Sequence, residues 1–237
     1  MLNQIKGDLL QLSNPEKAKN LSRYFQTGKG QYGEGDVFLG IPVPEQRRIA
    51  KRYLNLPLDD IQELLSSEIH EHRLTALLIL VSKYGKADNP GKEEIFNFYL
   101  KNTENINNWD LVDLTAPKIV GDYLFNKDAS ILFKLAKSNN LWERRIAVLS
   151  TFRFIDNNNF EDALSIAKLL LHDKHDLIHK AVGWMLREIG KRDQEIEEQF
   201  LSKHRMQMSR TMLRYAIEKF EENKRKFYLS QTTHKKR

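Results

Sequence analysis

The sequence predicts an all-α fold, and three patterns along it lead to this prediction. Apolar residues recur at the three-to-four-residue spacing of a helix over most of the 237 residues. Long helical segments begin at nearly regular intervals. No segment has the sustained two-residue alternation of a half-buried strand, so we expect no substantial β-sheet.

Individual helices have clear centres and boundaries. In the segment 71–81 apolar positions cover more than half of the helix circumference, as expected for a helix buried between neighbours. The segments 141–155 and 176–191 have the same pattern. Proline, asparagine and glycine mark the boundaries. Helices are expected to begin at Asn14-Pro15, Pro57-Leu58, Asn89-Pro90 and Ser209, and to end at Gly85 and Gly190.

A longer period joins these helices into repeats. Long helices are predicted at His70–Tyr84, Asn107–Leu124, Asn140–Ile155, His175–Gly190 and Ser209–Phe220. Each follows a shorter, more polar helix or turn, and their starts are 37, 33, 35 and 34 residues apart. Helical pairs at this spacing predict an α-solenoid of HEAT-like repeats with about 12 helices, whose second helices line a concave face. An irregular helical bundle is the alternative, since the repeats share little sequence.

Two segments depart from the repeats. Residues 27–36 contain four glycines and lead into Val37–Ile41, which predicts a small loop or hairpin near residues 27–41. It is interpreted either as a flap that touches a ligand or as a plain connection. Residues 223–237 end in His-Lys-Lys-Arg and are expected to form a flexible basic tail. We therefore expect a single HEAT-like domain over residues 1–222.

The charge balance and the amino-acid composition limit the classes of function that this protein can have. The 38 Lys and Arg residues exceed the 32 Asp and Glu residues by +6, and the pI is near 9.3, which favours a polyanionic partner. A merely soluble basic protein is the alternative. The absence of cysteine excludes disulfides, Cys-ligated zinc and thiol catalysis. Without a signal sequence or a membrane-length apolar run, we expect a cytoplasmic, nucleoid-associated protein.

A candidate site is predicted from four residues at equivalent places in successive repeats. Trp109 and Asp113 are one helical turn apart, so an aromatic plane lies beside an anion, which suits a positively charged group. Arg145 and Trp184 come from the next two repeats. Each residue has an ordinary interpretation, as core, cap or surface ion pair, but the four coincide at one repeat phase. Trp142 is assigned to packing.

Metal binding is a weaker hypothesis. Five histidines fall into two groups, but no carboxylate or second helix completes a tetrahedral site, and solvated helix positions explain them better. These histidines are His70, His72, His172, His175 and His179. We therefore expect no metal and no organic cofactor.

Several ordered segments resemble the AlkD-like family of DNA alkylation repair glycosylases, which are built from HEAT-like repeats. They extend from the second predicted helix nearly to the end of the chain. The segments are Arg23-Tyr24, Phe38–Ile41, Pro44–Arg47, Asn108–Asp113, Trp142–Arg145 and Lys180–Glu188.

The resemblance implies hydrolysis of the N-glycosidic bond of N3- or N7-alkylated purines in double-stranded DNA. A monomer is expected, as the default for a clamp that must surround a duplex. The resemblance also implies that Asp113 is the catalytic carboxylate, that Trp109 and Trp184 pack against the deoxyribose of the lesion, and that Arg145 binds the nearby phosphate. Further backbone contacts are implied for Tyr24, Arg153, Lys180, Arg187 and Lys191.

Two alternatives stay open. Relatives with a hairpin where this chain has its glycine-rich segment are associated with branched DNA, so a non-catalytic binder of branched or distorted DNA is the second hypothesis. The third is a protein-interaction scaffold without a role on DNA.

Overall fold

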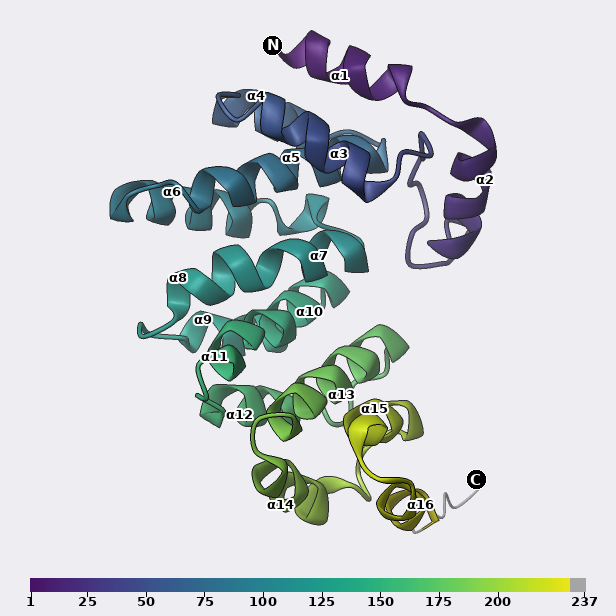
Figure 1. The fold of residues 1–237 in the computed structure, drawn as a ribbon, viewed down its shortest axis with the longest axis vertical. Coiled ribbons are helices and arrows are strands. Elements are labelled where there is room, and N and C mark those ends of the chain that lie inside the picture. Colours follow the sequence, from purple (N-terminus) through teal and green to yellow (C-terminus); the bar gives the residue numbers. More distant parts are fainter. Residues whose placement is uncertain (231–237) are drawn as a thin grey trace. The chain divides into compact units, whose positions relative to one another are not determined.

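The computed structural model describes residues 1–230, and their regular structure is helical apart from one isolated β-bridge between Val37 and Ile69. This confirms the all-α class of a HEAT-like solenoid. Contacts divide the chain into two compact units, Met1–Thr115 and Ala116–Arg237, which are described separately (Figure 1). The single domain over residues 1–222 stays a prediction.

The first unit consists of helices joined by short turns, with one long loop between α2 and α3 (Figure 1). Its elements are α1 Leu2–Gln11, α2 Pro15–Tyr24, α3 Val43–Arg52, α4 Leu58–Leu65, α5 His70–Tyr84, α6 Asn89–Lys101, the 3-10 turn η1 Thr103–Asn105 and α7 Trp109–Ala116.

The second unit is also helical throughout its described part. Its elements are the π-helical turn η2 Pro117–Gly121, α8 Asp122–Leu124, α9 Ser130–Ala136, α10 Leu141–Ser150, α11 Phe152–Asp156, α12 Glu161–Leu169, α13 Asp176–Gly190, α14 Gln194–His204, α15 Arg210–Ala216, the 3-10 turn η3 Ile217–Lys219 and α16 Glu222–Ser230.

The predicted repeat starts are confirmed to within two residues, at α5, α7, α10, α13 and α15. Side chains cap three of these helices, because Asn140, His175 and Ser209 accept hydrogen bonds from backbone N–H groups of the first turn. The structure has more helices than the expected number of about 12, because some of the expected long helices are divided into shorter ones. The segment 107–124 becomes α7, η2 and α8, and the segment 140–155 becomes α10 and α11.

Helix α5 forms the centre of the first unit. Every residue from His70 to Leu80 is buried, and α3, α4 and α6 pack against this helix. The predicted burial of 71–81 is thus confirmed for its first ten residues. However, the first turn of α5 is charged, so its burial requires partners for His70, Glu71 and Arg73.

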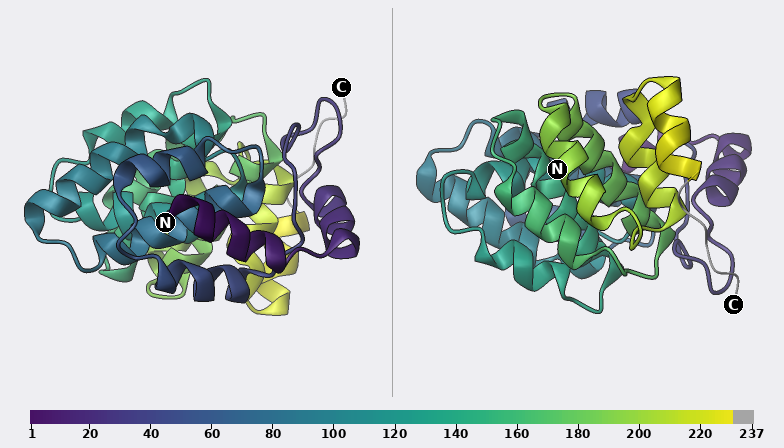
Figure 2. Two further views of the ribbon diagram at one scale, coloured as in Figure 1. Left: turned by 90° about the horizontal axis from the view of Figure 1, so that it is seen from above. Right: turned by 90° about the horizontal axis from the view of Figure 1, so that it is seen from below.

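Helices α13 and α15 pack side by side in the second unit (Figure 2). Gly183 of α13 makes this approach possible, because a Cβ atom there would lie 2.4 Å from the carbonyl oxygen of Met212 and 2.6 Å from Cβ of Tyr215. Helix α10 packs between α9 and α13. The consecutive helices therefore share one continuous apolar core within the unit.

The C-terminal segment differs from its prediction. Residues 222–230 form helix α16, and Tyr228 on this helix is buried against Phe220. The apolar contact of Tyr228 orders a segment whose composition predicts flexibility. Residues 231–237 of the expected tail lie outside the described residues. None of the helices in residues 1–230 combines the length and apolar character needed to span a bilayer.

Glu197 of α14 is an ionisable group with an unfavourable environment. It is 1% exposed, its carboxylate faces Gly190 at the end of α13, and its Oε1 atom has no hydrogen-bond partner. Burial, with Glu198 nearby, raises the pKa of Glu197 to about 9. Glu197 is therefore protonated at neutral pH.

Gly183→Ala should destabilise the protein by about 1–3 kcal/mol, because the added methyl group forces α13 and α15 apart. Gly7→Ala in α1 is the matched control, since nothing lies within 4 Å of its added Cβ. The control should be neutral or stabilising by up to about 1 kcal/mol. Thermal unfolding of both variants measures the difference, and equal effects would contradict the proposed close approach.

Glu197→Gln should stabilise the protein at pH 8 by on the order of 2 kcal/mol, or roughly 5 °C in Tm. The pKa of Glu197 is higher in the folded than in the unfolded protein, so the folded state binds more protons between pH 4.5 and about 9 and loses stability as the pH rises. Glutamine removes this dependence. Melts at pH 4 and pH 8 test it, and a gain of the same size at both values would contradict the assignment.

Candidate functional site

Helix α7 carries the first half of the predicted site. Most of its residues are buried, including Leu111, Val112 and Thr115, whereas Trp109 and Asp113 are half-buried and reach solvent. The helix is therefore held firmly by packing while an indole and a carboxylate one turn apart stay accessible. The charge of Asp113 also contributes, after burial, to a raised pKa of Tyr99, whose hydroxyl bonds Thr115 Oγ1 at 2.8 Å.

A row of rings supports Trp109. Its indole stacks on Phe25 with centroids 5.1 Å apart, and the Tyr24 ring meets it edge-on at 5.9 Å. Phe25 in turn stacks on Phe38 at 5.1 Å, and Phe38 stacks on His70 at 4.6 Å. Tyr24 is 65% exposed while Phe25 and Phe38 are buried, so one edge of this row faces solvent and the rest is core.

A network of charged side chains lies beside the rings. His70 bridges two carboxylates, with Nδ1 3.1 Å from Asp36 Oδ2 and Nε2 2.9 Å from Asp110 Oδ2. Asp36 also accepts hydrogen bonds from Arg73 at 2.5 Å and from Asn108 at 3.1 Å. All five side chains are buried, so each charge has a partner inside the protein.

These contacts define the protonation states. Burial alone would lower the pKa of His70, but the hydrogen bonds to Asp110 and Asp36 raise it to about 9. For Asp36 the directions are reversed: burial would raise the pKa of its carboxyl group, but the His70 hydrogen bond and the charge of Arg73 lower it. At neutral pH a protonated His70 therefore donates to both carboxylates.

The glycine-rich segment is an ordered loop, and the hairpin alternative is not formed. Its turns are closed by its own groups, since Gly28 N–H donates to Gln31 Oε1 and Gly30 N–H donates to Glu34 Oε2. Gly40 has φ +85° and approaches the backbone of α2, where a Cβ atom would lie 2.2 Å from the Asn14 carbonyl oxygen. The loop thus runs back along α2 (Figure 1).

Glu71 of α5 binds the C-terminal end of this loop, at residues 39–41. Its buried carboxylate accepts the backbone N–H groups of Leu39, Gly40 and Ile41 at 2.9, 2.8 and 3.2 Å. Three donors on one carboxylate compensate for its burial. The loop is consequently tied to α5 at Glu71 and, through Asp36, at His70 and Arg73.

Trp184 lies on α13 of the second unit. It is half-buried, its ring centroid is 6.2 Å from that of Phe152, and its Nε1–H donates to Glu188 Oε1 at 3.0 Å. Glu188 also pairs with Lys191 at 2.7 Å and with Arg187 at 3.3 Å. Burial would raise the pKa of Glu188, but the contacts with Lys191, Trp184 and Arg187 together lower it.

Arg145 is more deeply placed than a surface phosphate ligand would be. It is 5% exposed, and its Nη1 donates to the carbonyl oxygen of Leu177 at 2.5 Å. The side chain therefore joins α10 to the start of α13. The neighbouring Trp142 is buried, in agreement with its predicted packing role.

The cations predicted to contact DNA already have acidic partners. Arg153 pairs with Asp122 at 2.9 Å, Lys180 with Asp176 at 2.8 Å, and Lys191 with Glu188. Arg187 contacts both Glu188 and Glu218, and its side chain is only 17% exposed. A phosphate would have to replace these carboxylates, which costs little at the exposed pairs and more at Arg187.

The histidine interpretation requires a correction. His70 and His72 are buried at 2% and 7% exposure, so they are not solvated helix residues. Burial lowers the pKa of His72 to about 4, which makes it neutral. Within residues 1–230 no group of three or more His, Asp or Glu side chains is arranged to hold a metal ion.

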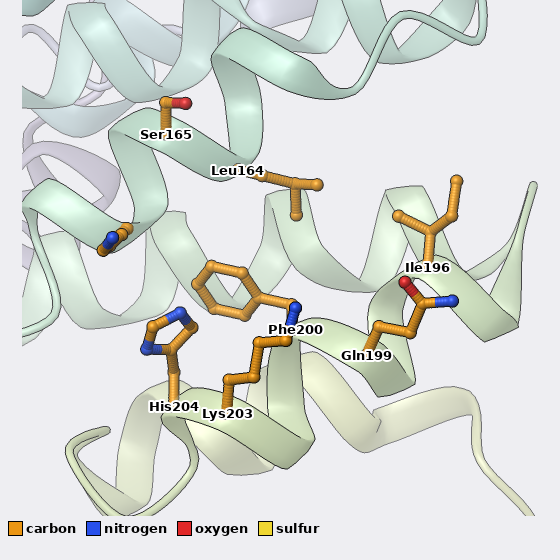
Figure 3. A pocket seen from close by; sticks show the side chains of 8 residues that line it. Leu164, Ser165, Ile196, Gln199, Phe200, Lys203 and His204 are labelled. Carbon is orange, nitrogen blue, oxygen red and sulfur yellow. The ribbon is translucent and has the colours of Figure 1, made fainter.

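A separate pocket of about 230 Å³ lies between α12 and α14 in the second unit (Figure 3). Lys168, Lys203 and His204 line it together with Phe200. Lys168 and Lys203 occupy the last turns of their helices, where a positive charge interacts favourably with the helix dipole. The pocket contains none of the predicted site residues.

A family model described as "DNA alkylation repair enzyme" matches residues 5–220. The chain belongs to this family. Membership supports a role in the repair of alkylated DNA and indicates DNA as the partner. No curated protein matches the sequence.

Solved structures agree in fold with this family. A predicted DNA alkylation repair enzyme from Enterococcus faecalis superposes with a TM-score of 0.68 at 19% identity, covering 89% of this chain and 97% of that one. AlkD2 from Streptococcus mutans gives a TM-score of 0.56 at 20% identity, covering 87% and 98% of the two chains. At these identities the likeness concerns the fold.

Three residues of this family member were missed by sequence reasoning. These residues are Asp36, His70 and Glu188, and they contact or neighbour the predicted site residues. Asp36 and His70 have partners far away in the sequence, whereas Glu188 has the pattern of an ordinary charged helix residue. The one available signal was the charged start of an otherwise apolar helix at His70–Arg73, because buried charges need partners.

Glu188→Ala should destabilise the protein by about 2–4 kcal/mol at pH 7, since it leaves the Trp184 N–H and two cations without their buried acceptor. The pKa of Glu188 is lowered on folding, so its contribution is present above pH 4.5 and is lost as the pH falls through its folded value. Glu222→Ala, at an exposed pair with Lys226, should cost under about 0.5 kcal/mol. Equal unfolding free energies for the two variants would refute this role.

Proposed function

We propose that the protein is a DNA glycosylase that removes N3- or N7-alkylated purines from double-stranded DNA. The observation that carries the proposal is the accessible pair of Trp109 and Asp113 on a helix whose residues are mostly buried. Membership of the DNA alkylation repair family supports the same substrate class.

The chemistry suits a carboxylate beside an indole. An alkylated purine of this kind carries a positive charge, so the bond from C1′ of the sugar to the base breaks with its electron pair moving to the base. Positive charge then develops on the sugar, as in glycoside hydrolysis. The oxygen of a water molecule forms the new bond to C1′, and a proton is released to the carboxylate or to solvent.

Each residue has a defined part in the proposal. Asp113 stabilises the developing positive charge and orients the water. Trp109 and Trp184 offer aromatic faces to the deoxyribose, which exclude water and add cation–π attraction. Arg145 is assigned to a phosphate by the resemblance of its segment, and one of its N–H groups is used by the Leu177 carbonyl oxygen.

The backbone contacts complete the proposal. Tyr24, Arg153, Lys180, Arg187 and Lys191 are assigned to the DNA backbone. Binding through such cations depends steeply on salt, because each neutralised phosphate releases counterions. DNA binding that ignores salt would favour the protein-interaction scaffold instead. Preference for four-way junctions without base release would favour the branched-DNA binder.

Asp113→Asn should reduce release of 7-methylguanine from methylated duplex DNA by about 10²–10³-fold, since amide and carboxylate have the same shape but only the carboxylate is charged. Single-turnover base release measured by chromatography tests this expectation. DNA affinity at fixed salt should change little.

Asp59→Asn is the control for this experiment. Asp59 is an exposed carboxylate in the first turn of α4, so its neutralisation should leave base release unchanged. Wild-type activity in Asp113→Asn, or no release of base by the wild-type protein, would refute the proposed function.

A further inference from the structure

His70 connects three parts of the first unit. It starts α5, contacts Asp36 of the glycine-rich segment, and contacts Asp110 of α7. Its ring also packs on Phe38 and lies 5.1 Å from Phe25. The charged groups that face it are the two carboxylates and Arg73, which is itself paired with Asp36.

Two routes lead from His70 to Trp109. Asp110 is the next residue in the chain after Trp109, so the hydrogen bond to its carboxylate restrains the backbone that carries the indole. Phe25 stacks on the indole at 5.1 Å and lies at the same distance from the imidazole. A displacement of His70 therefore reaches Trp109 through the chain and through ring packing.

The bridge requires the proton on His70. A neutral imidazole has one donor and one acceptor nitrogen, so one of the two carboxylates would face a lone pair. Both carboxylates are buried, and a buried carboxylate that faces the lone pair of a neutral imidazole is unfavourable, although Asp36 keeps its hydrogen bonds from Arg73 and Asn108. Loss of the proton would therefore remove one of the two hydrogen bonds by which His70 joins Asp36 to Asp110.

We propose that protonated His70 is a positioning residue for Trp109, which joins Asp36 to Asp110 and thereby holds the indole in the orientation used against the sugar of the lesion. The use of the indole rests on the proposed function. The fastening of the indole by His70 stands on the contacts alone. The glycine-rich segment gains a role here, since it supplies one of the two carboxylates that hold the bridge.

Nuclear magnetic resonance of ¹⁵N-labelled protein tests the fastening. Trp109→Phe assigns the indole signal of Trp109, and the histidine ring nitrogens report the protonation of His70. We expect the Trp109 indole signal to shift with the same midpoint as His70, near pH 9, while the signals of Trp142 and Trp184 do not share that midpoint. A Trp109 signal that stays constant through the titration of His70 would overturn the proposal.

Asp110→Asn provides the decisive variant. It keeps the size of the side chain but removes one of the two negative charges, so both midpoints should fall together by about one pH unit or more. His72→Asn is the matched control, because His72 is buried on the same helix but bonds Ser67 and touches neither carboxylate. Midpoints that stay in place in a folded Asp110→Asn variant would refute the bridge. The titration of the wild-type protein does not depend on Asp110→Asn, so failure of that variant to fold leaves the test intact.

Base release gives the functional readout. After subtraction of an enzyme-free blank, the single-turnover rate of the wild-type protein should fall about tenfold as the pH rises through the midpoint of His70. In Asp110→Asn the same fall should occur at a lower pH. A rate that is constant through the titration would show that His70 does not position the indole for reaction. No base release at any pH would refute the proposed function, whereas the indole titration would still decide whether His70 fastens Trp109.

Discussion

The first unit depends on the pairing of buried charges at the start of α5. His70, Glu71 and Arg73 are withdrawn from water by the helices packed around α5, so each must find its partner within the protein. The partners come from the glycine-rich segment and from α7. One electrostatic constraint therefore places a flexible sequence, a buried helix and the helix that carries Trp109 in a single arrangement.

In the second unit, α13 also contains a buried charged group whose partners lie within the protein. The buried carboxylate of Glu188 accepts the indole N–H of Trp184 and gathers cations around it. In the second unit a carboxylate thus bonds a half-buried tryptophan directly, whereas in the first unit the bonded carboxylate is that of Asp110, the residue next to the half-buried Trp109. This arrangement keeps an aromatic face accessible while its orientation is restrained.

Restraint of this kind suits a reaction that needs electrostatic preorganisation. A carboxylate stabilises a developing sugar cation best when it does not have to reorganise, and α7 is anchored by buried residues on its other sides. Ion pairs with Asp122, Asp176 and Glu188 hold the cations of Arg153, Lys180 and Lys191 in place. Family membership and local geometry together support repair of alkylated DNA as the setting of this chemistry.

The sequence by itself determined the all-α class, the phase of the repeats and the starts of the long repeat helices, because helical periodicity and capping are local properties of the chain. It also indicated Trp109 and Asp113, whose spacing of one turn is local. Only the tertiary structure decided the burial of His70, the order of the glycine-rich loop and the helix at 222–230. Each of these depends on partners distant in sequence, and no local pattern records such a pairing.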